Sequence, residues 1–404
     1  MRRFFRSQWL GKLVLALTIM SSISGCWSSY EINNLAIVTL LGIDLDENGQ
    51  FKMSALIVDP TMMNSGGQGG GKMESPFLIA SATGTNLFDS IRKISSTIPK
   101  KVYWAHLQAI IFGSEAAKDK MIPALDILAR QHEFRKNIDV LVSKGKASDI
   151  IGMRPNLKSD MGAEIRGIIR LSPKTSLTMV SDISRLTQDI SSDRTDHITG
   201  EISPSMEKGV EIIKSNKTTS AVSIRGTAVF KQDHFAGWMD QKETRGVLFL
   251  RDKVKGGIAK VPCRRDPSGM VSLQFSNVTT QKTPMIVNGQ PEMKVSIDVK
   301  ADIDEITCPD FHLNTQEVQY LNLKLKEQVI EYVEKALQKG QRQWGTDIFE
   351  FGDVIYKRFP KEWAKLKSSW RIDGLKKMKV RLDVSAHVTR SGLISDPLQA
   401  EESR

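Results

Sequence analysis

The sequence predicts an α+β fold with more than one domain, in which mixed sheets carry packed helices. Three observations support this class. Strand and helix patterns alternate in the first half of the chain, residues 220 to 310 are dominated by strand patterns, and a long amphipathic helix follows in the C-terminal half. The 404 residues are 40% hydrophobic and 25% charged, which are ordinary values for a globular protein. A chain of this length is expected to bury more than one core.

Residues 1 to 25 have the pattern of an export signal. Four bases and no acids accompany an apolar stretch from Leu13 to Met20, far shorter than the ~20 residues of a membrane-spanning helix. The next four residues, Ile23-Ser24-Gly25-Cys26, resemble the lipobox of bacterial lipoproteins, in which the cysteine becomes the first mature residue and receives a diacylglyceryl group. The alternative is a short uncleaved anchor with an incidental cysteine. We favour lipid attachment at Cys26, which would hold the mature protein on a membrane without spanning it.

Charge and cysteine content bear on three features of the protein: a nucleic-acid partner, a disulfide and a zinc site. Loss of the signal lowers the net charge from +11 to +7, and nucleic acid is not an expected partner because an exported protein does not meet it. The other two cysteines, Cys263 and Cys308, are either one disulfide, suited to an oxidising exterior, or two separate buried thiols. Neither has a second ligand at the spacing of a zinc site.

The N-terminal α+β domain is predicted over residues 26 to 195. Residues 35 to 59 are two β-branched runs joined through Asn48-Gly49, which predicts a β-hairpin with a two-residue turn. This turn begins like a calcium-binding loop, but Ala55 stands where the loop requires glutamate, so no calcium site is predicted. Beyond a glycine-rich loop, the spacing predicts further alternating elements: a helix over 86–98, a strand over 102–113, helices from 115 and through 131, and a strand over 137–145.

Residues 196 to 220 are polar and are predicted to connect this domain to a C-terminal α+β domain over residues 221 to 395, with a possible division near 300–315. Three strand segments are expected over 218–230, 271–281 and 293–306. The long helix after them should start at a capping box of Asn314 and Glu317 and end at Gly340. A last strand is expected after Met378.

Nothing in the chain demands an enzyme. The six histidines are scattered and no nucleophile motif is present, so no catalytic residue, cofactor or metal ligand is predicted. One basic segment, from Tyr356 to Arg381, has ten bases and two acids with tryptophans between them. Such a segment binds anionic headgroups or an acidic partner, or it is a solvated helix whose tryptophans enter the core. We favour the second interpretation.

Several long strings give the chain a family resemblance. Cys26-Trp27 with Glu31, the stretch "GTAVFKQDHFAGWMDQKETRGVLFLRDKVKGG" over 226–257 and "GTDIFEFG" over 345–352 are similar to the Ger(x)C proteins, the lipoprotein C subunits of spore germinant receptors. The resemblance implies a noncatalytic receptor subunit needed for spore germination. It also implies a place on the outer face of the inner spore membrane, where the subunit acts with two integral membrane subunits to sense nutrients.

The stretch 226–257 is the predicted docking region for these partners. Its candidate residues are Trp238, Lys242, Glu243 and Arg245, and its glycines are expected to form turns between short strands. Packing inside the domain is the competing interpretation. For the whole protein, the alternative function is a lipid-anchored solute-binding protein that delivers a nutrient to a transporter. Such proteins alternate strands and helices through both lobes, whereas residues 220 to 310 are strand-dominated.

Overall fold

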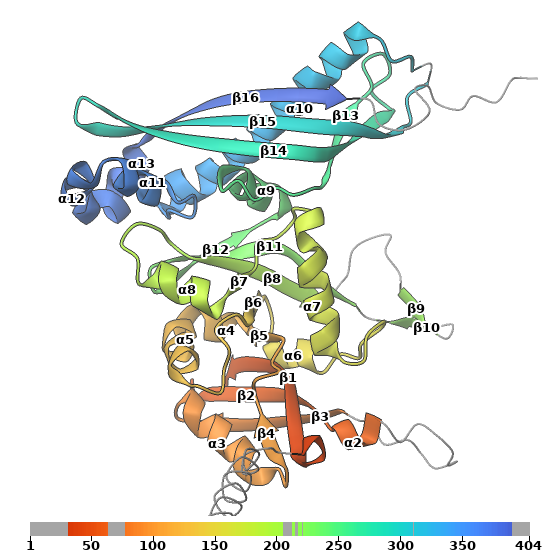
Figure 1. Ribbon diagram of the computed structural model, residues 1–404, viewed down its shortest axis with the longest axis vertical. Coiled ribbons are helices and arrows are strands. Elements are labelled where there is room, and N and C mark those ends of the chain that lie inside the picture. The colour runs from red at the N-terminus through yellow and green to blue at the C-terminus, as the bar shows by residue number, and fades with distance from the viewer. Residues whose placement is uncertain are drawn as a thin grey trace, which may run out of the picture.

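A computed structural model of the chain describes residues 31–63, 77–204, 212–214, 217–219, 221–309 and 311–389. Its described part is built on two large sheets, drawn one above the other in Figure 1, with the N-terminal strands at one end of the long axis and the second sheet at the other. The predicted signal, its Cys26 and the glycine-rich loop lie outside the described residues. The mixed α+β class predicted from the sequence is confirmed.

The first sheet has ten described strands in the order β12-β11-β8-β6-β5-β1-β2-β3, with β4 beside β1 and β7 beside β6. Its centre, β1-β5-β6-β8, is parallel, and its two outer parts are antiparallel. The strands are β1 Leu35–Leu45, β2 Phe51–Val58, β3 Phe77–Gly84, β4 Lys101–Tyr103, β5 Ala109–Phe112, β6 Asp139–Ser143, β7 Ser181–Asp182, β8 Ile198–Pro204, β11 Val222–Lys231 and β12 His234–Met239.

Helices cover both faces of this sheet, as its parallel centre requires. On one face α3, α4, α5 and α8 bury apolar residues of a shared core, and on the other α6 and α7 do so. Their bounds are α3 Leu87–Thr97, α4 Ser114–Asp119, α5 Met121–Arg130, α6 Ala147–Ile151, α7 Met161–Leu171 and α8 Ile183–Ile190, with a short α2 Pro60–Met63 after β2.

The first sheet includes strands on both sides of the polar segment 196–220. Strand β8 lies within that segment and pairs with β6, and β11 then pairs with β8. In the described part of this segment, β9 Ile212–Lys214 and β10 Lys217–Thr219 form a separate two-stranded hairpin that does not pair with the first sheet. The predicted domain limits themselves stay a prediction.

The predicted hairpin over residues 35 to 59 is confirmed as β1 and β2, but the predicted two-residue turn is wrong. Leu45 pairs with Phe51, which leaves a five-residue turn. The Asp46 carboxylate accepts hydrogen bonds from the backbone N–H groups of Asn48 and Gln50, at 2.9 and 2.8 Å, and Gly49 has a φ of 72°. The aspartate side chain therefore fixes a longer turn than the dipeptide alone implied.

The second sheet has four described strands in the order β13-β14-β15-β16. Helices α9 and α10 pack on it and share its apolar core, and the shorter helices α11 to α13 gather at one end of the sheet (Figure 1). The bounds are α9 Gln241–Leu250, β13 Ile258–Pro262, β14 Met270–Val287, β15 Gln290–Ile306, α10 Thr315–Ala336, α11 Phe351–Arg358, α12 Pro360–Ser369, α13 Leu375–Lys377 and β16 Lys379–Thr389.

Helix α10 begins where predicted, but the helical path that it starts continues past the predicted end at Gly340. The Asn314 side chain accepts from the Glu317 N–H, while the Glu317 carboxylate is 2.6 Å from Arg264 Nε. Gly340 does not end the helix, because a π-helical turn carries the chain on to Trp344 and Gly345 ends it with a φ of 66°. A side chain at Gly340 would meet the Phe349 ring at 2.7 Å, so this glycine is needed for close packing.

The structure decides the pairing of the cysteines and shows where the tryptophans of the basic segment lie. Cys263 and Cys308 form a disulfide. In the basic segment, Trp363 and Trp370 are buried and lie edge to face with ring centroids 5.4 Å apart. The tryptophans of this segment therefore pack in the core, and its lysines and arginines stay largely outside.

Candidate docking site

The predicted docking region, residues 226–257, carries the chain from the first sheet to the second. It contains the end of β11, the edge strand β12, helix α9 and the loop that leads to β13. Helix α9 packs against α10 beneath the second sheet (Figure 1). The region is thus a covalent connection between the two sheets.

Trp238 lies on β12 and is half-buried against the core of the first sheet. Its ring meets Phe235 edge to face, with centroids 5.2 Å apart, and the Lys144 ammonium lies 5.3 Å from the ring centroid. Much of the apolar surface of Trp238 is therefore covered by contacts inside the domain.

Lys242 and Glu243 lie in the first turn of α9. Asp240 and Glu243 form a capping box, and the Glu243 carboxylate also pairs with Lys339 at 2.8 Å. The Lys242 side chain is 56% exposed and its Nζ lies 3.5 Å from Glu331. Of these two residues, Lys242 presents its charge to solvent.

Arg245 points inward and joins the two halves of the molecule. Its guanidinium donates to the backbone carbonyls of Thr175, Ser176 and Ile258, at 3.2, 3.3 and 3.0 Å, and lies 5.3 Å from the centroid of the Tyr332 ring. The residue is only 8% exposed. A buried guanidinium whose N–H groups are bonded to these carbonyls stabilises the fold. The four predicted docking residues therefore do not form one exposed patch.

The sequence prediction missed a buried junction between the sheets, formed by residues 194–197 and 345–352. The Asp347 carboxylate accepts from the N–H groups of Phe351 and Gly352, at 3.0 and 2.7 Å, and from the indole of Trp370 at 3.1 Å. Complete burial raises the pKa of Asp347 to about 6, and these donors oppose that rise.

Asp196 completes the junction from the side of the first sheet. Its carboxylate accepts from the Asp347 N–H at 2.8 Å, while its own N–H donates to the Asp347 carbonyl at 2.9 Å. The same carboxylate lies 3.1 Å from Arg371. The motif 345–352 pointed to this segment, but no signal in the sequence identified Asp196 as its partner.

Glu350 anchors a second set of charges at the same junction. It adopts a left-handed backbone, with a φ of 63°, and its carboxylate lies 2.7 Å from Arg185, 3.5 Å from Arg251 and 3.8 Å from Lys282. Burial works against the charged form, yet these three cations lower the pKa of Glu350. Arg185 lies on α8, Arg251 directly follows α9 and Lys282 lies on β14. These ion pairs therefore connect the two sheets.

His197 is the residue of this junction that lies in an apolar setting. It is 1% exposed and stacks on Phe230 with ring centroids 4.8 Å apart. Burial, with a smaller effect of the Arg371 charge, lowers the pKa of His197 to about 3. The imidazole is therefore neutral at physiological pH.

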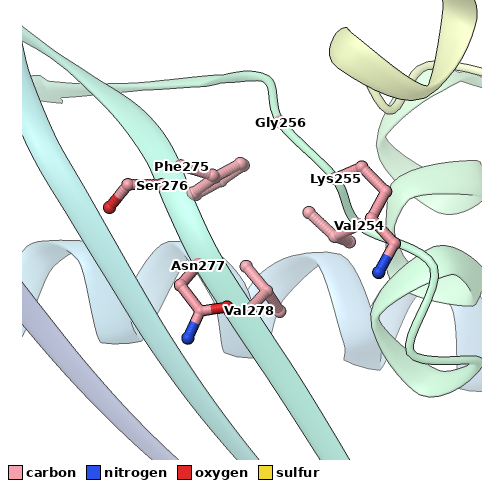
Figure 2. Close-up of a pocket in the computed structure, with 7 residues that line it drawn as sticks. All are labelled: Val254, Lys255, Gly256, Phe275, Ser276, Asn277 and Val278. Carbon is pink, nitrogen blue, oxygen red and sulfur yellow. The ribbon is translucent and has the colours of Figure 1, made fainter.

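A small pocket opens where β14 carries a bulge at Ser276. Figure 2 shows the pocket between the segment 254–256 and β14, with the Lys255 amino group on one side and the Ser276 and Asn277 side chains on the other. Its volume of about 70 Å³ suits ordered water.

In the part of the chain that the structure describes, no group of three histidine, cysteine or acidic side chains could hold a metal ion. Nor does any described helix have both the length and the apolarity to cross a membrane.

Two protein-family models match this chain, and together they include most residues of both sheets. The family model "Spore germination protein N-terminal domain" matches residues 28–204, and "Spore germination B3/GerAC like, C-terminal" matches residues 225–392. Among Bacillus subtilis proteins, spore germination protein KC is 25% identical over 96% of this chain and 98% of its own length. The putative spore germination protein YfkR is 26% identical over 73% of this chain and 74% of its own length.

A solved structure has the same fold. The crystal structure of the GerBC protein superposes with a TM-score of 0.56 at 18% identity, covering 86% of this chain and 96% of that one. Since both family models match in order and together span most of the chain, the resemblance noted in the sequence is confirmed. The chain belongs to the GerAC-like family of spore germination proteins.

Proposed function

We propose that this protein is the lipid-anchored, noncatalytic subunit of a nutrient germinant receptor. In this proposal it acts in spore germination by assembling with two integral membrane subunits on the outer face of the inner spore membrane. The observation that carries the proposal is the ordered match of both germination-protein models, at residues 28–204 and 225–392. Cys26 stands two residues before the first matched region, where a lipid anchor would leave the folded part intact.

The anchor is tested by Cys26→Ala in a spore-forming host. We expect loss of acylation, weaker membrane retention and a slower response of the spores to nutrient, because a single cysteine carries the lipid. Fractionation with mass spectrometry of the N-terminus measures the first two effects. Unchanged cleavage after Gly25 together with unchanged retention would exclude this anchor.

Assembly is tested by co-purification of the integral membrane subunits with the tagged, acylated protein. A solute-binding protein that serves a transporter would instead bind a nutrient by itself. Titration calorimetry of candidate nutrients into the purified chain separates the two functions. Saturable binding without the membrane subunits favours the solute-binding alternative.

A further inference from the structure

The loop between α6 and α7, residues 152–160, presents an apolar side chain to solvent on a fixed backbone. The Glu164 carboxylate accepts hydrogen bonds from three consecutive backbone N–H groups, those of Asn156 at 2.8 Å, Leu157 at 2.9 Å and Lys158 at 3.3 Å. Glu164 is only 8% exposed, whereas Leu157 is 89% exposed. The chain thus fixes this loop with a buried charge and leaves its leucine uncovered.

Further apolar surface lies beside this loop. A pocket of about 160 Å³ separates the loop from the edge strand β3, and its lining includes Leu56, Ile79 and Met153. Ile79 pairs with Leu56 on the face of the pocket and is 46% exposed, whereas Leu78 pairs with Ile57 on the other face of the same edge strand and is 54% exposed. An edge strand with uncovered apolar residues and no charge is unusual in a protein that stays free in water.

Basic residues flank the exposed leucine. Arg154 and Lys158 are both exposed, three residues before Leu157 and one residue after it. An apolar tip between cations is the arrangement by which peripheral proteins enter the interface of an anionic bilayer.

The loop lies near the part of β1 that follows Cys26, the proposed site of the lipid anchor. A side chain at Gly162, just beyond the loop, would lie 2.8 Å from the carbonyl oxygen of Thr39 on β1. Thr39 lies thirteen positions after Cys26 in the sequence, so the connecting chain spans at most about 45 Å even when fully extended. In Figure 1, β1 and β3 lie at the end of the molecule away from the second sheet, and α7 starts beside α6, between those strands and the second sheet.

We propose that residues 152–160, together with Ile79, are a membrane-docking surface. Leu157 enters the boundary of the acyl chains, and Arg154 and Lys158 contact anionic headgroups. This inference rests on the lipid anchor proposed at Cys26, which brings the surface to the bilayer. Since Glu164 already holds the loop in place, docking costs little additional ordering of the backbone.

The test uses one new thiol in the full acylated chain. Leu157→Cys would be the only free thiol, because Cys26 carries lipid and Cys263 is bonded to Cys308. A polarity-sensitive fluorophore on it is compared with the same probe at Leu171→Cys, a 53% exposed site at the other end of α7. In phosphatidylglycerol and phosphatidylethanolamine vesicles, we expect a blue shift and quenching by acyl-chain quenchers at 157 and neither effect at 171.

Three results would overturn or redirect the proposal. If the protein sediments with vesicles but the 157 probe stays in water, the anchor stands and the docking surface fails. If the 157 probe is protected only when the integral membrane subunits are present, the surface binds protein and the lipid assignment fails. If the acylated protein does not sediment, the anchor itself fails, and the unacylated chain then tests the surface alone.

In that last measurement the Cys26→Ala chain is mixed with the same vesicles. Leu157→Ser should weaken its partition about tenfold, since one buried leucine is lost. Arg154→Gln or Lys158→Gln should weaken it about fivefold at low salt. The matched control Leu171→Ser should change nothing, and equal partition of the Leu157→Ser and parent chains would contradict the proposal.

Discussion

The indole Nε1 of Trp370 donates a hydrogen bond to the Asp347 carboxylate at 3.1 Å, and this bond attaches the basic C-terminal segment to the junction between the two sheets. Asp347 is 1% exposed and Trp370 is fully buried. A buried carboxylate takes no compensation from water, so each of its donors matters to stability. The tryptophan therefore contributes a specific bond in addition to its packing.

Trp370→Phe is expected to lower the free energy of unfolding by about 1.5–3 kcal/mol more than loss of ring volume alone, because a hydrogen bond to a charged group disappears. Trp363→Phe is the matched control. Its Nε1 is also buried but has no partner among the described residues, so that substitution removes ring volume without breaking a bond. Urea unfolding of both variants measures the difference, and equal losses would mean that the Trp370 bond does not stabilise the fold.

The buried neutral His197 predicts a loss of stability in acid. Its folded pKa of about 3 lies below the ordinary value of 6.5, so the unfolded chain binds a proton in this window that the folded chain does not. The resulting stability is present above pH 6.5 and is lost as the pH falls toward 3, by about 2 kcal/mol between pH 7 and pH 5. His197→Phe should keep the stack on Phe230 and remove this loss.

The measurement is the unfolding free energy of both proteins at pH 7 and pH 5. Asp347 works in the opposite direction, since its raised pKa makes the folded state bind a proton as the pH falls through about 6. The comparison between parent and variant cancels that contribution. Identical pH dependence in the two proteins would show that His197 is not neutral in the folded state.

Local sequence signals predicted the elements well because the physical causes are local. The Asn86 cap of α3, the Asn314 cap of α10 and the β1–β2 hairpin each depend on residues within a few positions. The junction could not be found this way, because Asp196 and Asp347 are 151 positions apart and meet only through the fold. The family resemblance marked residues 345–352 as distinctive without indicating what Asp347 binds.

The predicted docking residues show the same limit. Arg245 is a predicted docking residue because it is a charged neighbour of Trp238, but the partners of its guanidinium are carbonyls supplied by two other parts of the chain. The prediction for one glycine of this region was wrong. Gly246 was expected in a turn, yet it lies inside α9, where the absence of a side chain allows close approach of α10.

Gly246→Ala should therefore be strongly destabilising, by about 3 kcal/mol, the upper part of the range for an overpacked core. The added Cβ would lie 2.0 Å from the Tyr332 carbonyl oxygen and 2.7 Å from the Ala336 Cβ, so one helix must move. Gly167→Ala on α7 is the control, since its nearest contact would be the flexible end of Lys158 at 3.9 Å. That change should raise stability by up to about 1 kcal/mol through helix propensity. Thermal unfolding compares the two, and similar effects would contradict the close approach of α9 and α10.

Substitutions at Arg245 and Lys242, two residues of α9, distinguish an effect on the stability of the fold from an effect on assembly with the membrane subunits. Arg245→Met leaves three carbonyls without their donor and is expected to cost about 3 kcal/mol or more, so any loss of partners in this variant follows from a weakened fold. Lys242→Glu reverses an exposed charge in the first turn of α9 and should change stability by less than about 1 kcal/mol.

Pull-down of the integral membrane subunits with each acylated variant, together with its melting temperature, decides between docking and packing. If α9 contacts a partner, Lys242→Glu should keep its melting temperature and lose recovery of the membrane subunits by about tenfold or more. Trp238→Ala should lose both, since its ring also packs on Phe235 and beneath Lys144. Full recovery with Lys242→Glu, and loss only in variants that unfold early, would make residues 226–257 a purely structural connection between the sheets.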